Sequence, residues 1–235
     1  DIAQALALMG VRPTWEVASR RVTGFEILPL DVLDRPRVDV TLRVSGFFRD
    51  AFPAQIDLFD SAVRAVASLE ESGNLNPIAM RCREEADALI QQGTSPLEAT
   101  RLAGYRVFGS KPGAYGAGLQ ALIDEGGWDN ESDFARAYLA WGGYAYGNGE
   151  HGAPAAELLT TRLSKVQVVL HNQDNREHDI LDSDDYYQFE GGLSATVKHL
   201  TGASPVIYHN DHSRPERPRV ASLKEEIGRV VRGRV

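Results

Sequence analysis

Two periodicities of apolar residues alternate along the 235-residue chain and predict an α/β fold. Residues 38–44 carry β-branched side chains at mostly alternate positions, which is typical of a strand. Residues 53–69 instead place apolar side chains at helical spacing, after a short loop. Strand, loop and helix form half of a parallel βαβ unit, so we expect residues 1–73 to be an α/β segment. Its first helix, over residues 1–9, should end at Gly10.

The middle of the chain, residues 74–160, contains few strand signals and predicts a mainly helical block. Ser95, followed by Pro and a Glu three positions on, has the pattern of a capping box. Asn130 should cap a second helix that has an aromatic face. Glycine-rich loops are expected at 109–118 and 142–149.

The last part, residues 161–235, returns to an α/β pattern. Strands are predicted over 166–171 and 205–209, and helices over 192–200 and from Leu223 onward. We expect this segment to continue the first sheet. The fold class is therefore α/β, with mostly parallel sheet units at both ends and a mainly helical block between them.

Composition narrows the class of protein. Hydrophobic residues make up 43% of the chain, which is enough for a folded core, and the net charge of -8 argues against nucleic acid as a partner. The single cysteine, Cys82, fits a reducing compartment such as the cytoplasm. Apolar runs are too short to span a membrane, and no signal peptide is found. Both ends have the pattern of interrupted elements, so we expect a fragment of a longer protein.

A dense polar stretch, His171–Glu190, follows a predicted strand. Within twelve residues it holds six carboxylates and one imidazole: Asp174, Glu177, His178, Asp179, Asp182, Asp184 and Asp185. Ligands bind beyond the carboxyl ends of strands in open α/β sheets. Carboxylate and imidazole ligands suit a divalent metal, and clustered carboxylates raise one another's pKa and so act as general bases. A solvated acidic loop is the alternative, and both interpretations stay open.

A second polar stretch, Tyr208–Arg219, follows the next predicted strand. His209 and His212 are candidate metal ligands, although such a pair needs further ligands to form a site. The arginines of this stretch form a basic patch that can bind carboxylates. The two polar stretches share one crevice if their strands are neighbours. A surface loop whose histidines bond to its own backbone is the alternative.

Residues 107–118 resemble a phosphate-binding loop only superficially. Lys111 is followed by Pro112, where the phosphate-loop pattern requires Ser or Thr, so we expect no ATP on this chain. The glycines allow the backbone to approach a flat ligand or another chain closely, or they form a flexible surface turn.

Arg49 and Asp50 lie where the first predicted strand passes into its helix. Functional sites are often built at such junctions. The alternative is a simple loop in which the aspartate caps the helix.

Seven stretches together resemble the large subunit of the aerobic, ATP-dependent cobaltochelatases, which is related to the porphyrin-binding subunit of magnesium chelatase. They are Val11–Trp15, Arg35–Val40, Ser45–Asp50, Arg106–Leu119, Trp141–Gly147, Asn172–Gly192 and Tyr208–Ser213. The stretches are long, occur in order and extend along nearly the whole chain. Such a subunit is much longer than this chain.

The resemblance implies a ligase that forms nitrogen–metal bonds. It implies that Co²⁺ is inserted into hydrogenobyrinic acid a,c-diamide, a tetrapyrrole precursor of cobalamin (vitamin B12). It also implies that separate AAA+ partner subunits bind ATP and Mg²⁺ and hydrolyse the ATP. The missing phosphate loop agrees with that division.

Metal insertion needs weak metal ligands, bases for the ring protons and cations for the ring carboxylates. We expect the bases to be His178, Asp182, Asp184 and Asp185. We expect the metal ligands to be His178, Asp182, His209 and His212. We expect the substrate to be bound by Arg176, Arg214, Arg217, Lys111 and Tyr115.

Two other function classes stay open. The chain can be a non-catalytic structural or docking module of the large subunit, inactive in isolation. It can also be a carboxylate-dependent hydrolase, which only the acidic stretch suggests. Calorimetry with Co²⁺ and the macrocycle separates the first alternative from a catalytic site, and hydrolytic turnover by the chain alone tests the second.

Overall fold

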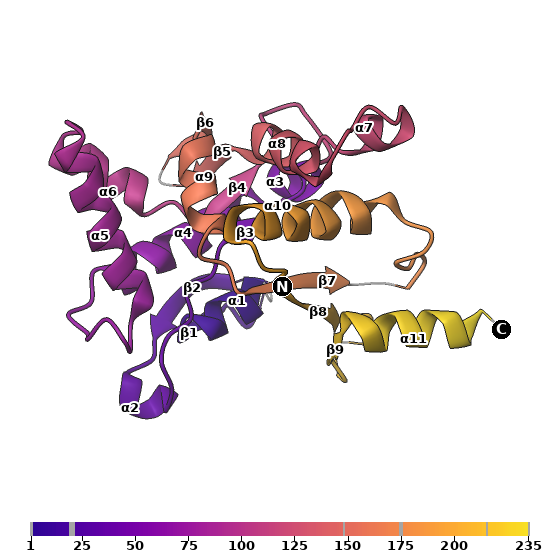
Figure 1. Ribbon diagram of the computed structural model, residues 1–235. Helices are drawn as coiled ribbons and strands as arrows, with labels where there is room; N and C mark the ends of the chain where they lie inside the picture. The colour runs from indigo at the N-terminus through magenta and orange to yellow at the C-terminus, as the bar shows by residue number, and fades with distance from the viewer. Residues whose placement is uncertain (1, 19–21, 148, 174–175, 215, 235) are drawn as a thin grey trace. The chain divides into compact units, whose positions relative to one another are not determined.

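The computed structural model describes residues 2–18, 22–147, 149–173, 176–214 and 216–234 (Figure 1). The chain divides into two compact units. Unit 1 consists of Asp1–Pro112 and Tyr144–Leu158, and unit 2 of Gly113–Gly143 and Leu159–Val235. Both units draw on the middle of the chain, so neither coincides with one of the three segments predicted from the sequence.

Unit 1 contains a four-stranded sheet in the order β3-β4-β5-β6. The strands are β3 (Leu42–Arg43), β4 (Val107–Gly109), β5 (Tyr144–Gly147) and β6 (Glu150–Pro154). β3 and β4 are parallel, whereas the other pairs are antiparallel. β1 (Val11–Trp15) and β2 (Val22–Ile27) form a separate antiparallel hairpin. Three of these strands lie in the block that the sequence predicted to be mainly helical.

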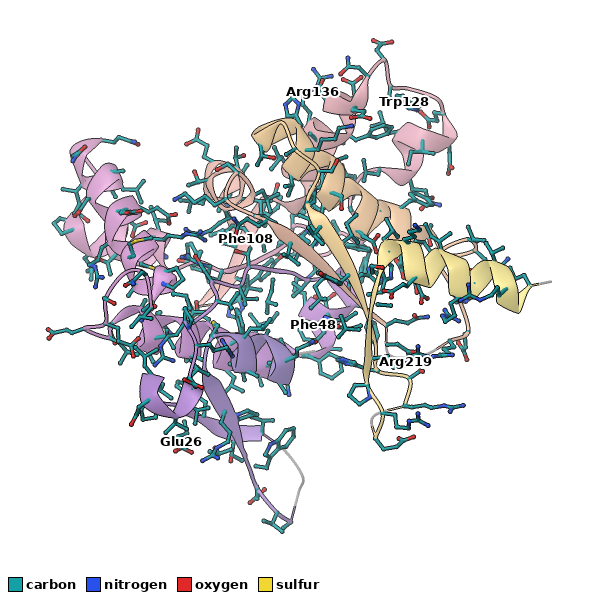
Figure 2. All side chains as sticks on the ribbon, turned by 60° about the horizontal axis from the view of Figure 1, so that its bottom comes forward. Glu26, Phe48, Phe108, Trp128, Arg136 and Arg219 are labelled. Carbon is teal, nitrogen blue, oxygen red and sulfur yellow. The ribbon has the colours of Figure 1, made fainter. Side chains whose placement is uncertain are left out.

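The described residues of unit 1 also form helices that pack with these strands. They are α1 (Ile2–Leu8), α2 (Leu30–Leu33), α3 (Gly46–Ala51), α4 (Pro53–Ala67), α5 (Pro77–Gln91) and α6 (Pro96–Ala103). The buried face of α4 supplies Ile56, Phe59 and Val63 to the core, as its periodicity predicted. Phe108 on β4 is also fully buried (Figure 2). These elements hold the ends of β3 and β4 in place.

The capping box expected at Ser95 is only half formed. The Ser95 hydroxyl accepts a hydrogen bond from the Glu98 amide at 3.4 Å. The Glu98 carboxylate does not reach back, because it forms an ion pair with Arg101 one turn along the helix. The helix begins at Pro96 as predicted, since proline is favoured at the first helical position.

Unit 2 is built on a three-stranded sheet in the order β7-β8-β9. β7 (Val168–Gln173) and β8 (Val206–Asp211) are parallel, and β9 (Arg219–Ser222) returns antiparallel along β8. Within the described ranges these strands pair only with one another, so the expectation that they continue the first sheet is corrected. β9, which the sequence did not predict, takes the second edge of β8.

The helices of unit 2 include one unusual turn. They are α7 (Gln120–Asp124), α8 (Glu131–Gly142), the π-helix η1 (Tyr186–Gly191), α10 (Gly192–Thr201) and α11 (Leu223–Gly233), and α9 (Ala156–Leu163) begins in unit 1. Residues 184–190, at the end of the polar stretch His171–Glu190, are therefore helical and not a loop. η1 runs directly into α10, which packs against α8.

The α/β class with parallel strand pairs is confirmed. Antiparallel strands extend each parallel pair, so both of these sheets are mixed. Among the described residues, no helix is both long and apolar enough to cross a membrane.

Candidate functional site

The two polar stretches begin side by side in unit 2. β7 and β8 are parallel neighbours, with His171 opposite His209 and Asn172 opposite Asn210. The Asn210 side-chain amide donates to Asn172 Oδ1 at 2.9 Å and ties the two strand ends together. The condition for a shared crevice, that the two strands be neighbours, is met. Both stretches leave the sheet at the same edge, where ligands bind in α/β folds.

A largely buried group of four side chains, here called the histidine cluster, lies on one face of this sheet. Its members are His171, Tyr186, Glu190 and His209. Glu190 Oε2 lies 3.0 Å from His209 Nε2 and 3.9 Å from His171 Nδ1. The His171 ring stacks on Tyr186 with centroids 4.4 Å apart. One carboxylate therefore lies within reach of two imidazoles.

Two members of the histidine cluster are short of hydrogen bonds. Glu190 Oε2 and both ring nitrogens of His209 are buried and have no hydrogen-bond partner among the described residues. Glu190 Oε2 and His209 Nε2 are close enough for an ion pair, but they are not aligned as a hydrogen bond. Buried polar groups without partners are rare and often mark functional sites. The cluster is thus a candidate for proton or ligand chemistry.

Burial sets the electrostatics of the histidine cluster. It lowers the pKa of His171, with the neighbouring His209 adding to the effect and Glu190 opposing it. Burial also raises the pKa of Tyr186 to about 12, and the charges of Glu226 and Glu190 act in the same direction. His171 therefore favours its neutral form, which can accept a proton, whereas Tyr186 keeps its own.

The π-helix η1 positions two members of the histidine cluster and a third buried side chain. Tyr186, Gln188 and Glu190 are its buried residues. Gln188 accepts a hydrogen bond from the Ala117 amide at 3.2 Å and donates to Asp184 Oδ2 at 2.7 Å. π-turns inside helices are frequent at functional sites. This turn connects the glycine-rich loop to the polar stretch.

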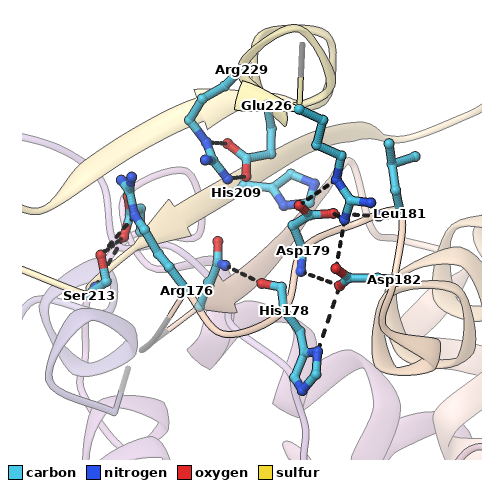
Figure 3. A network of polar contacts seen from close by, with 12 residues as sticks. Arg176, His178, Asp179, Leu181, Asp182, His209, Ser213, Glu226 and Arg229 are labelled. Atoms are coloured by element: carbon cyan, nitrogen blue, oxygen red, sulfur yellow. Dashed lines mark hydrogen bonds and ion pairs between the residues drawn. The ribbon is translucent and has the colours of Figure 1, made fainter. Parts of the chain in front are cut away.

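Helix α11 contributes a second buried carboxylate near His209 (Figure 3). Glu226 accepts two hydrogen bonds from Arg229, at 2.9 and 2.5 Å. Arg229 lowers the pKa of Glu226 despite burial, and a charge on His209 acts in the same direction. The carboxylate thus stays ionised beside the buried imidazole.

The predicted pair His178 and Asp182 lies outside the histidine cluster. His178 Nδ1 is 3.7 Å from Asp182 Oδ1, and the His178 side chain is 68% exposed. Arg234 binds both Asp182 and Asp179, at 2.6 and 2.7 Å. Asp174, which belongs to the same acidic run, lies outside the described residues. The run is therefore held partly by a cation that follows α11.

Of the predicted bases, Asp184 and Asp185 begin the helix that carries η1. Asp184 accepts the hydrogen bond from Gln188. The pKa of Asp185 is raised, first by burial and then by the charge of Asp184, while His178 opposes the shift. A raised pKa is what a carboxylate base needs to hold a proton near neutral pH.

The predicted substrate-binding cations differ in their surroundings. Arg176 forms an ion pair with Asp211 and donates to Ser213 Oγ at 3.1 Å. The pKa of Asp211 falls to about 2, because hydrogen bonds from Arg176 and Ser213 outweigh its burial. Arg214 and Arg217 are exposed on the loop before β9. Arg176 is also exposed, with 43% of its side chain accessible, and differs from them in its contacts with Asp211 and Ser213.

Lys111 and Tyr115 fall in different units, because the unit boundary follows Pro112. Tyr115 is 59% exposed. Packing explains two glycines of this loop: a Cβ on Gly118 would lie 2.2 Å from the Trp141 ring. A Cβ on Gly116 would lie 3.0 Å from Gln188 Oε1.

The predicted metal ligands are not gathered into one set. His212 lies beyond the end of β8, where its backbone amide bonds to the Gln173 carbonyl at 2.7 Å. In the part of the chain that the structure describes, no group of three or more His, Cys, Asp or Glu side chains could hold a metal ion. The assignment of His178, Asp182, His209 and His212 stays a prediction.

Sequence reasoning missed the roles of His171, Tyr186 and Glu190, although all three lie in the stretch it selected. A usable signal was present. His171 and His209 each end an apolar run at the same position of a predicted strand. Tyr186 and Glu190 lie four residues apart, on one face of a helix.

Comparison with known proteins agrees with this picture. The profile of the CobN/Magnesium Chelatase family matches residues 1–235. The chain is 65% identical to the aerobic cobaltochelatase subunit CobN of Sinorhizobium sp, with all of this chain and 18% of that protein covered. It is 34% identical to a magnesium-chelatase subunit of Rhodobacter capsulatus, with 99% of this chain and 19% of that protein covered.

A solved structure gives the same result. The catalytic subunit of cobaltochelatase from Mycobacterium tuberculosis matches with a TM-score of 0.89 and 46% identity, covering 98% of this chain and 19% of that one. The chain thus spans less than a fifth of the length of these relatives. By sequence and by structure, the chain belongs to the CobN/magnesium chelatase family.

Proposed function

We propose that this chain supplies part of the metal-inserting site of a cobaltochelatase large subunit. The substrate metal is Co²⁺ and the acceptor is a tetrapyrrole, hydrogenobyrinic acid a,c-diamide, in cobalamin biosynthesis. One observation carries the proposal. Glu190 lies buried between two imidazoles, 3.0 Å from His209 and 3.9 Å from His171, at the carboxyl edge of a parallel strand pair.

The histidine cluster supplies what insertion requires. When Co²⁺ enters the ring, its bonds to the inner nitrogens form as two N–H bonds break, so two protons must leave. Neutral imidazoles and a carboxylate accept protons, and burial keeps His171 neutral. Glu190 Oε2 lies 3.0 Å from His209 Nε2, which is within reach of direct proton transfer once the two groups align, whereas the 3.9 Å to His171 Nδ1 requires a bridging water. The cluster thus acts as the proton acceptor.

The metal is handed over by weak ligands. His178, Asp182, His209 and His212 remain our candidates, because imidazole and carboxylate suit cobalt. His178 and Asp182 follow β7, His212 follows β8, and His209 lies within β8. Asp184 and Asp185 are additional bases. Arg214, Arg217 and Arg176 are the candidates for binding ring carboxylates, with Lys111 and Tyr115 as further contacts.

ATP hydrolysis is assigned to partner subunits. Lys111 is followed by Pro112, which does not fit a phosphate-binding loop. We therefore propose AAA+ partners that bind ATP and Mg²⁺, and a cytoplasmic location consistent with one free cysteine.

The test uses the assembled chelatase with substitutions in this segment. Glu190→Gln and His209→Gln should each slow cobalt insertion by roughly 10²-fold or more, since positioned acid–base groups contribute about that much. Insertion is followed by the change in ring absorption, and ring affinity by fluorescence quenching. Affinity should stay within about twofold, a change small on the scale of binding free energies.

Glu125→Gln is the matched control, because Glu125 is an exposed carboxylate of unit 2. It should insert cobalt at the wild-type rate. If both cluster variants insert cobalt at the wild-type rate, the catalytic function is refuted and the docking-module function is favoured.

A further inference from the structure

Unit 1 contains a pocket that the proposed chemistry does not use. It has room for about 140 Å³ and is lined by Arg49, Asp50, Pro53, Ile56, Asp57, Pro112, Tyr146, Gly147, Glu150 and His151. An apolar cavity of about 150 Å³ is large enough for benzene, so this pocket can take a group of several heavy atoms. It lies wholly within unit 1, so a ligand bound there is independent of the proposed metal-inserting chemistry.

Three of the stretches that carry the family resemblance meet at this pocket. Arg49 and Asp50 come from the stretch after β3, Pro112 from the loop after β4, and Tyr146 and Gly147 from β5. β3 and β4 are a parallel pair, so both loops leave the sheet at the same edge. The position is again the one where α/β sheets bind ligands.

The buried arginine of the pocket is part of its wall. Arg49 donates to both oxygens of Asp50, at 2.6 and 2.8 Å, and to the carbonyls of Ser110 and Lys111, at 3.1 and 3.0 Å. The Tyr146 hydroxyl donates to the same Ser110 carbonyl at 2.5 Å. Because its donors are used within the wall, Arg49 is poorly suited to bind an anion.

The charge left over on the wall is negative. The lining holds the three carboxylates of Asp50, Asp57 and Glu150 against one guanidinium. Asp50 forms an ion pair with Arg49, and Glu150 forms one with Arg101. The side chains of Asp57 and His151 make no hydrogen bond or ion pair within the described ranges. Asp57 is therefore the carboxylate available to a ligand.

We propose that this pocket binds a cationic side chain, an arginine or a lysine, presented by a protein partner. The cation would pair with Asp57, while its methylenes lie against Pro53, Ile56 and Pro112. A bare metal ion fits less well, because the described residues offer no set of three ligands in suitable positions. A flexible stem with a charged end matches both the apolar and the acidic lining.

The probe is acetyl-arginine methylamide, titrated into the whole chain and followed through the ring resonances of His151 by NMR. The control probe is acetyl-citrulline methylamide, which has nearly the same shape without the charge. We expect saturable binding of the arginine probe with a dissociation constant of about 1 mM, as for a single weak contact, and none of the citrulline probe. Equal shifts with both probes would overturn the proposal.

Variants give a second, independent readout. Asp57→Asn should weaken binding about two- to fivefold, as expected for one exposed ion pair, and Asp57→Lys should abolish it. Asp87→Asn, at an exposed carboxylate on α5 of the same unit, should change nothing. Unchanged affinity in Asp57→Lys would sink the idea. Displacement of the probe by stoichiometric Co²⁺ would also overturn the proposal. Tighter binding of free putrescine than of the arginine probe would overturn it too, because the ligand would then be a small diamine.

Discussion

Gly191 and Gly192 stand side by side where η1 joins α10, and an alanine at each should have opposite effects. Both have helical backbone angles, near φ −60°. A Cβ on Gly191 would find its nearest neighbour at 3.8 Å, which is ordinary contact. A Cβ on Gly192 would lie 2.3 Å from Leu119 Cδ1 and 2.6 Å from Tyr138 Cδ2. The first site has space, and the second has none.

The magnitudes follow from these distances. Alanine in place of a helical glycine gains about 0.5–1 kcal/mol, so Gly191→Ala should raise the free energy of unfolding by that amount. Gly192→Ala gains the same term but overpacks two fully buried side chains, Leu119 and Tyr138, at a cost of about 1–3 kcal/mol. We expect a net loss of about 1–2 kcal/mol.

Urea unfolding followed by tryptophan fluorescence measures both variants. Trp141 and Trp128 lie in unit 2 and report on this packing. The two midpoints should move in opposite directions from wild type. Equal shifts of the same sign would refute the claim that close packing of Gly192 against Leu119 and Tyr138 fixes the helix that carries Glu190.

Two further predictions concern single side chains of unit 2. Because burial lowers the pKa of His171 below its usual 6.5, the unfolded chain binds more protons there. Wild-type stability should therefore fall as the pH drops from about 6.5 through the lower folded pKa. The His171→Gln variant should not show this loss of stability at low pH. If wild type and variant lose stability in parallel as the pH falls, the prediction is wrong. Asn130→Ala removes the side-chain acceptor of the capping box of α8 and should cost about 1 kcal/mol in thermal unfolding. No loss there would mean that the cap contributes nothing.

Long, periodic elements were predictable because their signals are local. α4 and α8 follow from apolar spacing and, for α8, from the Asn130 cap, which does form a full capping box with Asp133. β7 and β8 follow from their β-branched runs. In each case the residues that decide the structure lie within one or two turns of one another.

The short strands inside the middle block were not predictable in the same way. β4 has three residues and β5 has four, rich in glycine and tyrosine. Neither has an alternating pattern long enough to identify. They become strands because β4 pairs with β3, which lies more than sixty residues earlier in the chain (Arg106 bonds to Asp39, 67 residues away). Such pairing is a tertiary effect.

In the candidate site, too, the features set by local sequence were predictable and those set by tertiary packing were not. The sequence located the stretch His171–Glu190, but its emphasis fell on charged residues that the structure places near the surface. Asp179 and Asp182 are held by Arg234, more than fifty residues away. Glu190 drew no emphasis because burial between two imidazoles depends on how β7, β8 and η1 pack. Charge density is visible in a sequence, whereas burial of a single carboxylate is not.

The central claim is that Glu190 and His209 act as one proton-accepting unit. A double-mutant cycle on the rate of cobalt insertion in the assembled chelatase tests it most directly. Groups that act together are strongly non-additive, so Glu190→Gln combined with His209→Gln should insert cobalt about as fast as the slower single variant. If the two losses instead multiply, the residues act independently and the account of the histidine cluster is wrong.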